Sequence, residues 1–223
     1  MDSSSARGSK PGDLKEAFNY RPCDDPEGGW PDSAVQFRES NKAVYQRLTD
    51  LSYRLLDVLS IGLGLDKSFM KDCHQYIGTT KCSTTLRTLY YPPIPTDSKI
   101  KPGQIRLGEH SDYGSVTLLF QDDVGGLEVK VPGGDFIPVT PIPGTMLVNI
   151  GDLMQRWTSD RLVATKHRVL IPEEELLQKR CRQSVVFFLH PDDDYVVRCL
   201  DGSDKYEPIS SLDYLKYRFS MTY

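Results

Sequence analysis

The 223-residue sequence has only four histidines, no paired cysteine motif and no long apolar run. None of its apolar stretches approaches the roughly 20 residues that a membrane-spanning helix needs. The five cysteines form no CxxC pair and show no scaffold spacing, which is typical of reduced thiols. A net charge of −4 argues against the basic surface of a protein that binds nucleic acid or anionic membranes. These absences predict a cytoplasmic protein without nucleic-acid or membrane partners, and they leave its oligomeric state open.

Composition divides the chain into four parts. Residues 1–12 are rich in Ser, Gly and Lys and lack the apolar stretch of a signal peptide, so we expect a disordered tail. We expect a helical N-terminal region at 13–80, a strand-rich domain at 81–200 and a C-terminal segment at 201–223. The length fits one domain with a full core, or such a core with a small helical appendage.

The helical pattern runs from Pro31 to about Gly64, where apolar residues recur every three and four positions. The apolar stripe consists of Val35, Phe37, Val44, Leu48, Leu51, Leu55, Val58, Leu59 and Ile61. Shorter helices are expected at 66–73, 153–157 and 211–219. Asp152 is placed to cap the second of these. The long helix therefore needs a partner surface to cover its stripe.

After Thr80 the apolar period changes from helical spacing to two. Strands are expected at 85–91, 104–112, 115–120, 126–131, 135–139, 145–150, 163–171 and 182–189. A helical front end followed by many short strands predicts a mainly β fold, a double-stranded β-helix or jelly roll, with an N-terminal helical region and a C-terminal helix. The open mouth of such a sandwich allows strands from both sheets to aim side chains at one metal.

Two of the four histidines fall in a metal-binding pattern. His110 and Asp112 are two residues apart in an expected strand, so their side chains point the same way. His167 begins another expected strand about 55 residues later. Two imidazoles and one carboxylate form the facial triad that leaves coordination positions open on Fe(II). A lone His-x-Asp is common without a metal, but its combination with a second histidine and a downstream Arg-x-Ser indicates an iron site. His74 and His190 are expected to be capping or surface residues.

Arg182 and Ser184 share one face of the strand expected at 182–189. A guanidinium meets a carboxylate with two parallel hydrogen bonds, and a serine hydroxyl adds a third, so this pair predicts a carboxylate site. Tyr91 ends its strand on the face of Leu89. It is either a core tyrosine with a bonded hydroxyl or a ligand contact.

Four sequence runs carry a resemblance to a known family. They are His110-Ser-Asp-Tyr-Gly-Ser-Val-Thr-Leu-Leu-Phe-Gln-Asp-Asp-Val-Gly-Gly-Leu-Glu-Val, Val148-Asn-Ile-Gly-Asp152, Thr165-Lys-His-Arg-Val169 and Arg182-Gln-Ser-Val-Val-Phe-Phe. Over roughly residues 30–200 the chain resembles the isopenicillin N synthase-like family of 2-oxoglutarate and Fe(II)-dependent oxygenases and related oxidases. The first run is the most specific of the four.

The resemblance implies a dioxygenase that oxidises a small organic substrate, by hydroxylation or desaturation, and releases succinate and CO2. It implies that Fe(II) is bound by His110, Asp112 and His167. By the same resemblance, 2-oxoglutarate is the co-substrate and is held by Arg182, Ser184 and Tyr91, with ascorbate as a further candidate cofactor.

Two departures from the family leave alternatives open. Leu89 stands where many members have Asn before Tyr-Tyr-Pro, which removes a polar contact to the co-substrate. This favours an Fe(II)-dependent oxidase that does not use 2-oxoglutarate. The resemblance also begins almost at the N-terminus, so we expect an N-terminally short form without the family's N-terminal strand and with marginal stability. Such a form could be a truncated, non-catalytic metabolite-binding or interaction protein.

Overall fold

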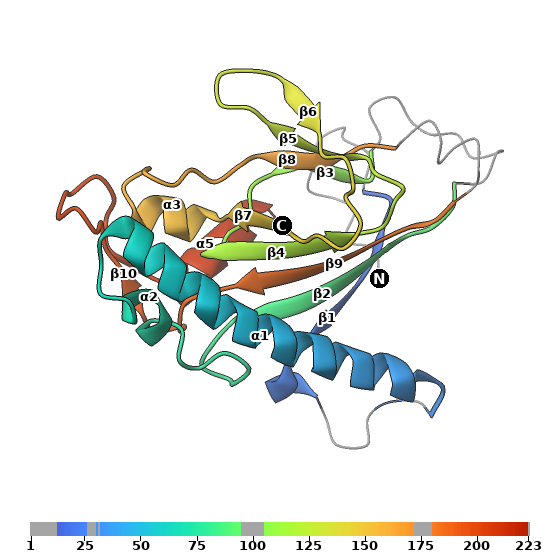
Figure 1. The fold of residues 1–223 in the computed structure, drawn as a ribbon, viewed down its shortest axis with the longest axis horizontal. Coiled ribbons are helices and arrows are strands. Elements are labelled where there is room, and N and C mark those ends of the chain that lie inside the picture. Colours follow the sequence, from blue (N-terminus) through green and yellow to red (C-terminus); the bar gives the residue numbers. More distant parts are fainter. Residues whose placement is uncertain (1–12, 26–29, 31, 95–104, 172–179, 223) are drawn as a thin grey trace.

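The structure, a computed structural model, describes residues 13–25, 30, 32–94, 105–171 and 180–222. Two antiparallel sheets account for most strands: five strands in the order β1-β2-β9-β4-β7 and four in the order β3-β8-β5-β6 (Figure 1). This arrangement is the predicted double-stranded β-helix. The expected disordered tail at 1–12 lies outside the described residues.

The strand bounds follow the sequence pattern closely. The larger sheet comprises β1 (Glu16–Tyr20), β2 (Thr85–Tyr91), β9 (Arg182–Leu189), β4 (Val116–Gln121) and β7 (Leu147–Ile150). The smaller sheet comprises β3 (Leu107–His110), β8 (His167–Val169), β5 (Leu127–Lys130) and β6 (Phe136–Pro138). A separate pair is formed by β10 (Val196–Val197) and β11 (Ile209–Ser210). In β9 the alternation is clear, because Arg182 and Ser184 are buried whereas Gln183 between them is exposed.

Four α-helices and two 3-10 turns surround the sheets in the described part of the chain. The helices are α1 (Val35–Leu63), α2 (Phe69–Asp72), α3 (Asp152–Trp157) and α5 (Ser211–Thr222), and the turns are η1 (Pro22–Asp24) and η2 (Asp32–Ala34). Gly64 ends α1 in the left-handed conformation, with φ of 78°, which glycine adopts without steric cost. None of the helices among these residues is long and apolar enough to cross a membrane.

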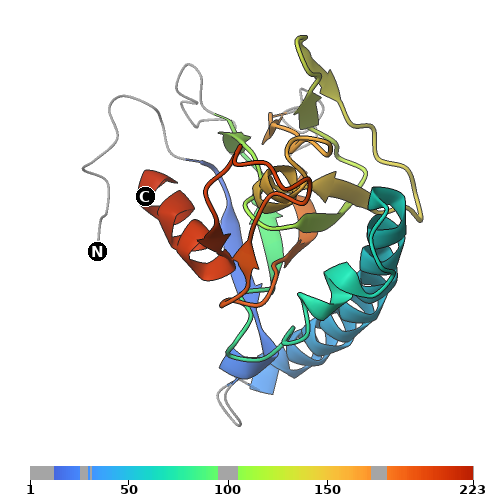
Figure 2. The same cartoon turned by 90° about the vertical axis from the view of Figure 1, so that its left-hand side faces the viewer.

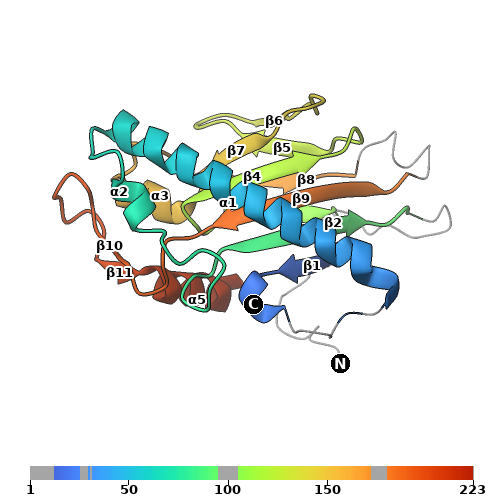
Figure 3. The ribbon, with the colours of Figure 1, turned by 60° about the horizontal axis from the view of Figure 1, so that its bottom comes forward.

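The long helix α1 lies across the outer face of the larger sheet (Figure 3). Its Tyr45 ring packs edge-on against Phe187 of β9, with centroids 5.1 Å apart, and Leu56 is fully buried. The predicted apolar stripe is wrong at both ends, because Val35, Val58 and Ile61 are 50%, 64% and 59% exposed. Besides Tyr45, Leu48 and Leu56, the buried face carries the small or polar residues Asn41, Thr49, Ser52 and Ser60. The hydroxyls of Thr49 and Ser60 donate to helix carbonyls one turn earlier, which satisfies them inside the core.

A strand that the sequence did not predict forms the edge of the larger sheet. Glu16–Tyr20 pairs antiparallel with β2 over five residues, so this segment of the chain does join the sheet. Within the region expected to be helical, the segment before α1 is therefore partly extended. Phe18 of this strand contacts the rings of Trp30 and Phe37, each at 5.3 Å between centroids. Strand β1 pairs with the backbone of β2 and leads the chain toward α1.

The helix α5 lies on the other side of the larger sheet from α1 (Figure 2). It is joined to α3 by an ion pair between Arg218 and Asp152. The prediction that Asp152 caps α3 is wrong, because Gly151 occupies the N-cap and Asp152 is the first helical residue. The carboxylate is bonded to Arg218, and the helix N-terminus still favours a negative charge at that position.

The prediction that His74 and His190 are capping or surface residues is also wrong. His74 is fully buried, with Nδ1 2.6 Å from the carbonyl oxygen of Met70 and Nε2 2.9 Å from the hydroxyl of Ser115. Burial lowers its pKa to about 4. His190 is buried at the end of β9, and its pKa is lowered to about 4 for the same reason. Both are neutral in the folded core at neutral pH.

Candidate functional site

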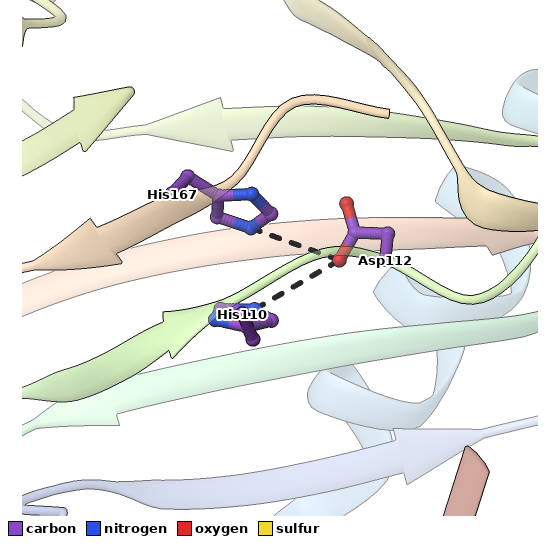
Figure 4. A group of neighbouring side chains, drawn as sticks. All are labelled: His110, Asp112 and His167. Carbon is purple, nitrogen blue, oxygen red and sulfur yellow. Dashed lines mark ion pairs between the residues drawn. The ribbon is translucent and has the colours of Figure 1, made fainter. Parts of the chain in front are cut away.

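His110, Asp112 and His167 converge at the mouth of the jelly roll (Figure 4). One ligand atom from each lies within 4.8 Å of the others. Oδ1 of Asp112 is 3.9 Å from Nε2 of His110 and 3.7 Å from Nε2 of His167. Two imidazole nitrogens and one carboxylate oxygen at this spacing surround a point that suits a divalent ion, and the donor set matches the facial triad of non-haem iron.

The smaller sheet positions the two histidines. His110 ends β3 and His167 begins β8, and the two residues are direct partners in the antiparallel register. Asp112 lies beyond the end of β3, so strand alternation is not what orients it, and that part of the prediction is wrong. Its position is set instead by the backbone of Asp152, whose N–H donates to the carbonyl oxygen of Asp112 at 2.8 Å.

Hydrogen bonds on the far side of each side chain orient the three candidate ligands. Nδ1 of His110 lies 2.8 Å from the carbonyl oxygen of Gly108, and Nδ1 of His167 lies 3.0 Å from that of Thr165. A carbonyl only accepts, so each Nδ1 carries the proton and each Nε2 keeps its lone pair toward the centre. Burial and the neighbouring His167 lower the pKa of His110, which favours the neutral, metal-binding form. The residues therefore fit Fe(II).

Asn149 of β7 was not singled out as a site residue, although it lies in one of the runs that carry the family resemblance. Its side-chain amide donates to Oδ2 of Asp112 at 3.0 Å. This bond satisfies one carboxylate oxygen and leaves Oδ1 facing the two imidazoles. The run Val148-Asn-Ile-Gly-Asp152 contains this residue, but only the tertiary structure shows that its amide contacts Asp112.

Arg182 and Ser184 lie in the same cavity as the three candidate ligands. The Arg182 side chain is almost fully buried and donates from Nε to the carbonyl oxygen of Gly125 at 2.7 Å and from Nη2 to Oε1 of Gln121 at 3.1 Å. Nη1 lies 3.5 Å from the Ser184 hydroxyl. Burial lowers the pKa of the guanidinium, whereas nearby Tyr91 raises it. Both groups are fixed by β9 and present donors to one end of the cavity.

Tyr91 lies directly opposite Arg182 in the pairing of β2 with β9. Its ring centroid is 4.9 Å from the guanidinium carbon of Arg182, and burial raises the pKa of its hydroxyl. A second buried cation, Arg106, lies 6.0 Å from the same ring and was not predicted as a site residue. It donates to the carbonyl oxygens of Leu14 and Pro92 and so joins the segment before β1 to the end of β2.

All six residues predicted for the site line one cavity of about 840 Å³. Its apolar walls include Leu119, Val186 and Phe188, which project from the larger sheet. A cavity of this size takes small ligands. The helix α5 contributes Leu212, Leu215 and Phe219 to the lining.

Comparison with known proteins agrees with this geometry. Residues 82–191 match the profile of the 2OG-Fe(II) oxygenase superfamily. The chain is 34% identical to the 2-oxoglutarate-dependent dioxygenase htyE of Aspergillus rugulosus, over 95% of this chain and 68% of that protein. It is also 34% identical to the 2-oxoglutarate-Fe(II) type oxidoreductase ppzD of Metarhizium rileyi, over 95% of this chain and 62% of that protein.

A solved structure has the same fold. It is that of a full-length protein of Neurospora crassa in complex with alpha-KG and thymine, with a TM-score of 0.82, 34% identity and coverage of 96% of this chain and 67% of that one. The chain thus spans between 62% and 68% of the length of these three relatives. The jelly roll, the convergence of two histidines and an aspartate, and these similarities lead to one conclusion: the chain belongs to the 2OG-Fe(II) oxygenase superfamily.

Proposed function

We propose that this protein is an Fe(II)- and 2-oxoglutarate-dependent dioxygenase that oxidises a small organic molecule with release of succinate and CO2. The observation that carries the proposal is that the His110, Asp112 and His167 cluster and the buried Arg182 line the same cavity. A metal site alone would also suit a binding protein. A metal site that shares its cavity with a buried guanidinium suits an enzyme that binds a metal and an acidic co-substrate together.

Each residue has a defined part in this proposal. Nε2 of His110, Nε2 of His167 and Oδ1 of Asp112 hold the metal, and Asn149 orients the carboxylate. When bound, Fe(II) supplies the dioxygen chemistry that protein side chains lack. Arg182 and Ser184 bind the far carboxylate of 2-oxoglutarate, and Tyr91 flanks it. Leu119, Val186 and Phe188 form apolar walls that keep water from the reacting centre.

A small-molecule substrate is supported by the size of the cavity and by the relatives. The Neurospora neighbour has thymine bound, and the cavity of about 840 Å³ has room for a co-substrate and a substrate of that size. Identity between the two chains is 34%, which supports the same class of chemistry. Residues at the end of the cavity away from Arg182 would contact the substrate itself.

One observation favours a second candidate, an oxidase that does not use 2-oxoglutarate. Leu89 is the direct partner of Ser184 in the pairing of β2 with β9, and it packs with Tyr91 and Val186. An apolar side chain at this position offers no hydrogen bond to a co-substrate next to Ser184. The remaining donors, Arg182, Ser184 and Tyr91, are sufficient for one carboxylate, so the dioxygenase is the stronger proposal.

Succinate release tests both candidates. The purified protein is incubated in air with Fe(II) and 2-oxoglutarate, and succinate is measured with and without a metabolite mixture as substrate. A dioxygenase forms succinate only when iron and 2-oxoglutarate are both present, and His110→Ala abolishes it. Oxygen uptake with the mixture but without 2-oxoglutarate would support the oxidase. Absence of both activities in a protein that binds the metal would support the non-catalytic form.

A further inference from the structure

Arg87 stands on the cavity side of β2, remote from the Arg182 end. The cavity is lined by Thr85, Arg87, Leu89 and Tyr91, which are alternate residues of this strand. Arg87 is four residues from Tyr91, which at the rise of a strand is about 13 Å. Its cross-strand partners are Asn19 on β1 and Val186 on β9. Arg87 and Arg182 therefore belong to opposite ends of the same cavity.

The partners of Arg87 are neutral. Its Nε donates to Oδ1 of Asn19 at 2.7 Å, and its guanidinium carbon lies 5.4 Å from the centroid of the Phe188 ring. Within the described residues no carboxylate comes within ion-pair distance of Arg87. The two cavity-lining cations that flank β1 differ in this respect. Lys15 is paired with Asp13 at 2.8 Å and Arg21 with Asp24 at 2.6 Å.

The hydrogen bond to Asn19 leaves several N–H donors of the two side chains without a partner in this bond. Because the amide oxygen of Asn19 accepts from Arg87, its Nδ2 is left to donate, and the terminal nitrogens of Arg87 are donors as well. A planar guanidinium recognises two acceptor atoms in one plane. The Phe188 ring, over which the guanidinium lies, also lines the cavity and adds apolar surface next to these donors.

We propose that Arg87 and Asn19 bind the substrate that is oxidised, and that this substrate presents a planar acceptor edge, a carboxylate or a ring carbonyl, against Phe188. The inference rests on the proposed dioxygenase function and adds the chemistry of its substrate. Arg182 takes the co-substrate carboxylate at one end, and Arg87 takes the substrate about 13 Å along the strand, so the two ligands do not compete for one guanidinium.

Calorimetric titration of the full chain tests this. The protein is loaded with Mn(II) and 2-oxoglutarate, so that no turnover occurs, and is titrated with phenylacetate, thymine and phenethylamine. We expect phenylacetate or thymine to bind and the cationic phenethylamine not to bind. Arg87→Met should weaken the acceptor probe at least tenfold. Arg87→Lys distinguishes a carboxylate ligand from a ring-carbonyl ligand, because a retained charge preserves more of the affinity for a carboxylate than for a ring carbonyl.

Arg54→Met is the matched control, because Arg54 is an exposed arginine on α1 and its loss should leave probe affinity unchanged. Asn19→Ala provides a second variant, with an expected severalfold loss, if Arg87→Met has a lowered melting temperature. Equal affinity of wild type and Arg87→Met, tighter binding of phenethylamine, or no binding of either acceptor probe would overturn the inference. Failure of the wild type to bind 2-oxoglutarate in the loading step would instead count against the proposed function.

Discussion

The side-chain amide of Asn149 donates to Oδ2 of Asp112 at 3.0 Å. Asn149 belongs to β7 of the larger sheet, where it pairs with Thr117 of β4, whereas the two histidines come from the smaller sheet. The carboxylate is thus held from one sheet and the imidazoles from the other. The relative placement of the two sheets sets the distances within the cluster, so a residue that binds no metal itself can govern metal affinity.

Replacement of Asn149 by Ala is therefore expected to lower metal affinity about 10- to 100-fold, because Asp112 loses the bond that orients it. His110→Ala should lose most of the bound metal. Equilibrium dialysis with Mn(II) measures both. Gln46→Ala is a matched control, since it removes an amide-to-carboxylate hydrogen bond, to Asp50, on the surface of α1. A full equivalent of tightly bound metal in His110→Ala would show that the three residues are not the ligands.

Loss of the Arg182 guanidinium should weaken 2-oxoglutarate binding by about 3 kcal/mol, because the co-substrate carboxylate is left in the cavity without a charged partner. Calorimetric titration of Arg182→Met in the presence of Mn(II) measures this. Arg182 also donates to Gly125 and Gln121, so the melting temperature of the variant is recorded alongside. Ser184→Ala, which keeps those bonds, should show a smaller loss of affinity. Unchanged affinity in both variants would assign the carboxylate site elsewhere.

Truncation of Phe18 tests whether β1 stabilises the fold. Its ring contacts Trp30 and Phe37, so Phe18→Ala should lower the free energy of unfolding by about 1–2 kcal/mol. Phe120→Ala is the matched control, because Phe120 is 37% exposed, close to the 39% of Phe18, and makes no ring contact among the described residues. Chemical denaturation compares the two. Equal losses would mean that the aromatic cluster at β1 adds nothing beyond ordinary surface burial.

His74 should make stability depend on pH in the acidic range. Burial lowers its pKa from 6.5 to about 4, so between these values the unfolded chain binds a proton that the folded chain does not. The free energy of unfolding is therefore at its full value above pH 6.5. As pH falls toward 4, protonation of His74 in the unfolded chain lowers it progressively, by about 3 kcal/mol. Denaturation of metal-free protein at several pH values measures the slope.

The control is His74→Gln, which cannot titrate. Its free energy of unfolding should be lower at pH 7 but should fall less steeply between pH 6.5 and 4 than that of the wild type. The residual slope is expected to come partly from His190, whose pKa is also lowered to about 4. Identical slopes in the two proteins would show that His74 titrates alike in the folded and unfolded states.

Local pattern in the sequence was enough for much of the architecture. Strand β9 and strand β2 have the bounds that alternation predicted, and α1 ends at Gly64 as expected. The convergence of His110, Asp112 and His167 followed from residue chemistry and spacing, because two histidines and one aspartate at that spacing, with Arg-x-Ser downstream, indicate an iron site. The shared face of Arg182 and Ser184 followed from the two-residue period of a strand.

Tertiary structure decided what depends on contacts between distant segments. Strand β1 exists because it pairs with β2 about 70 residues later, and its own sequence lacks a clear alternation. Asp112 lies outside β3 and is oriented by Asn149 and Asp152, so its direction could not be read from parity. The buried face of α1 combines Tyr45, Leu48 and Leu56 with small polar residues such as Ser52 and Ser60, a mixture that the apolar period alone did not predict. Residue types fixed the available chemistry, and long-range pairing, which local periodicity does not encode, decided which groups face one another.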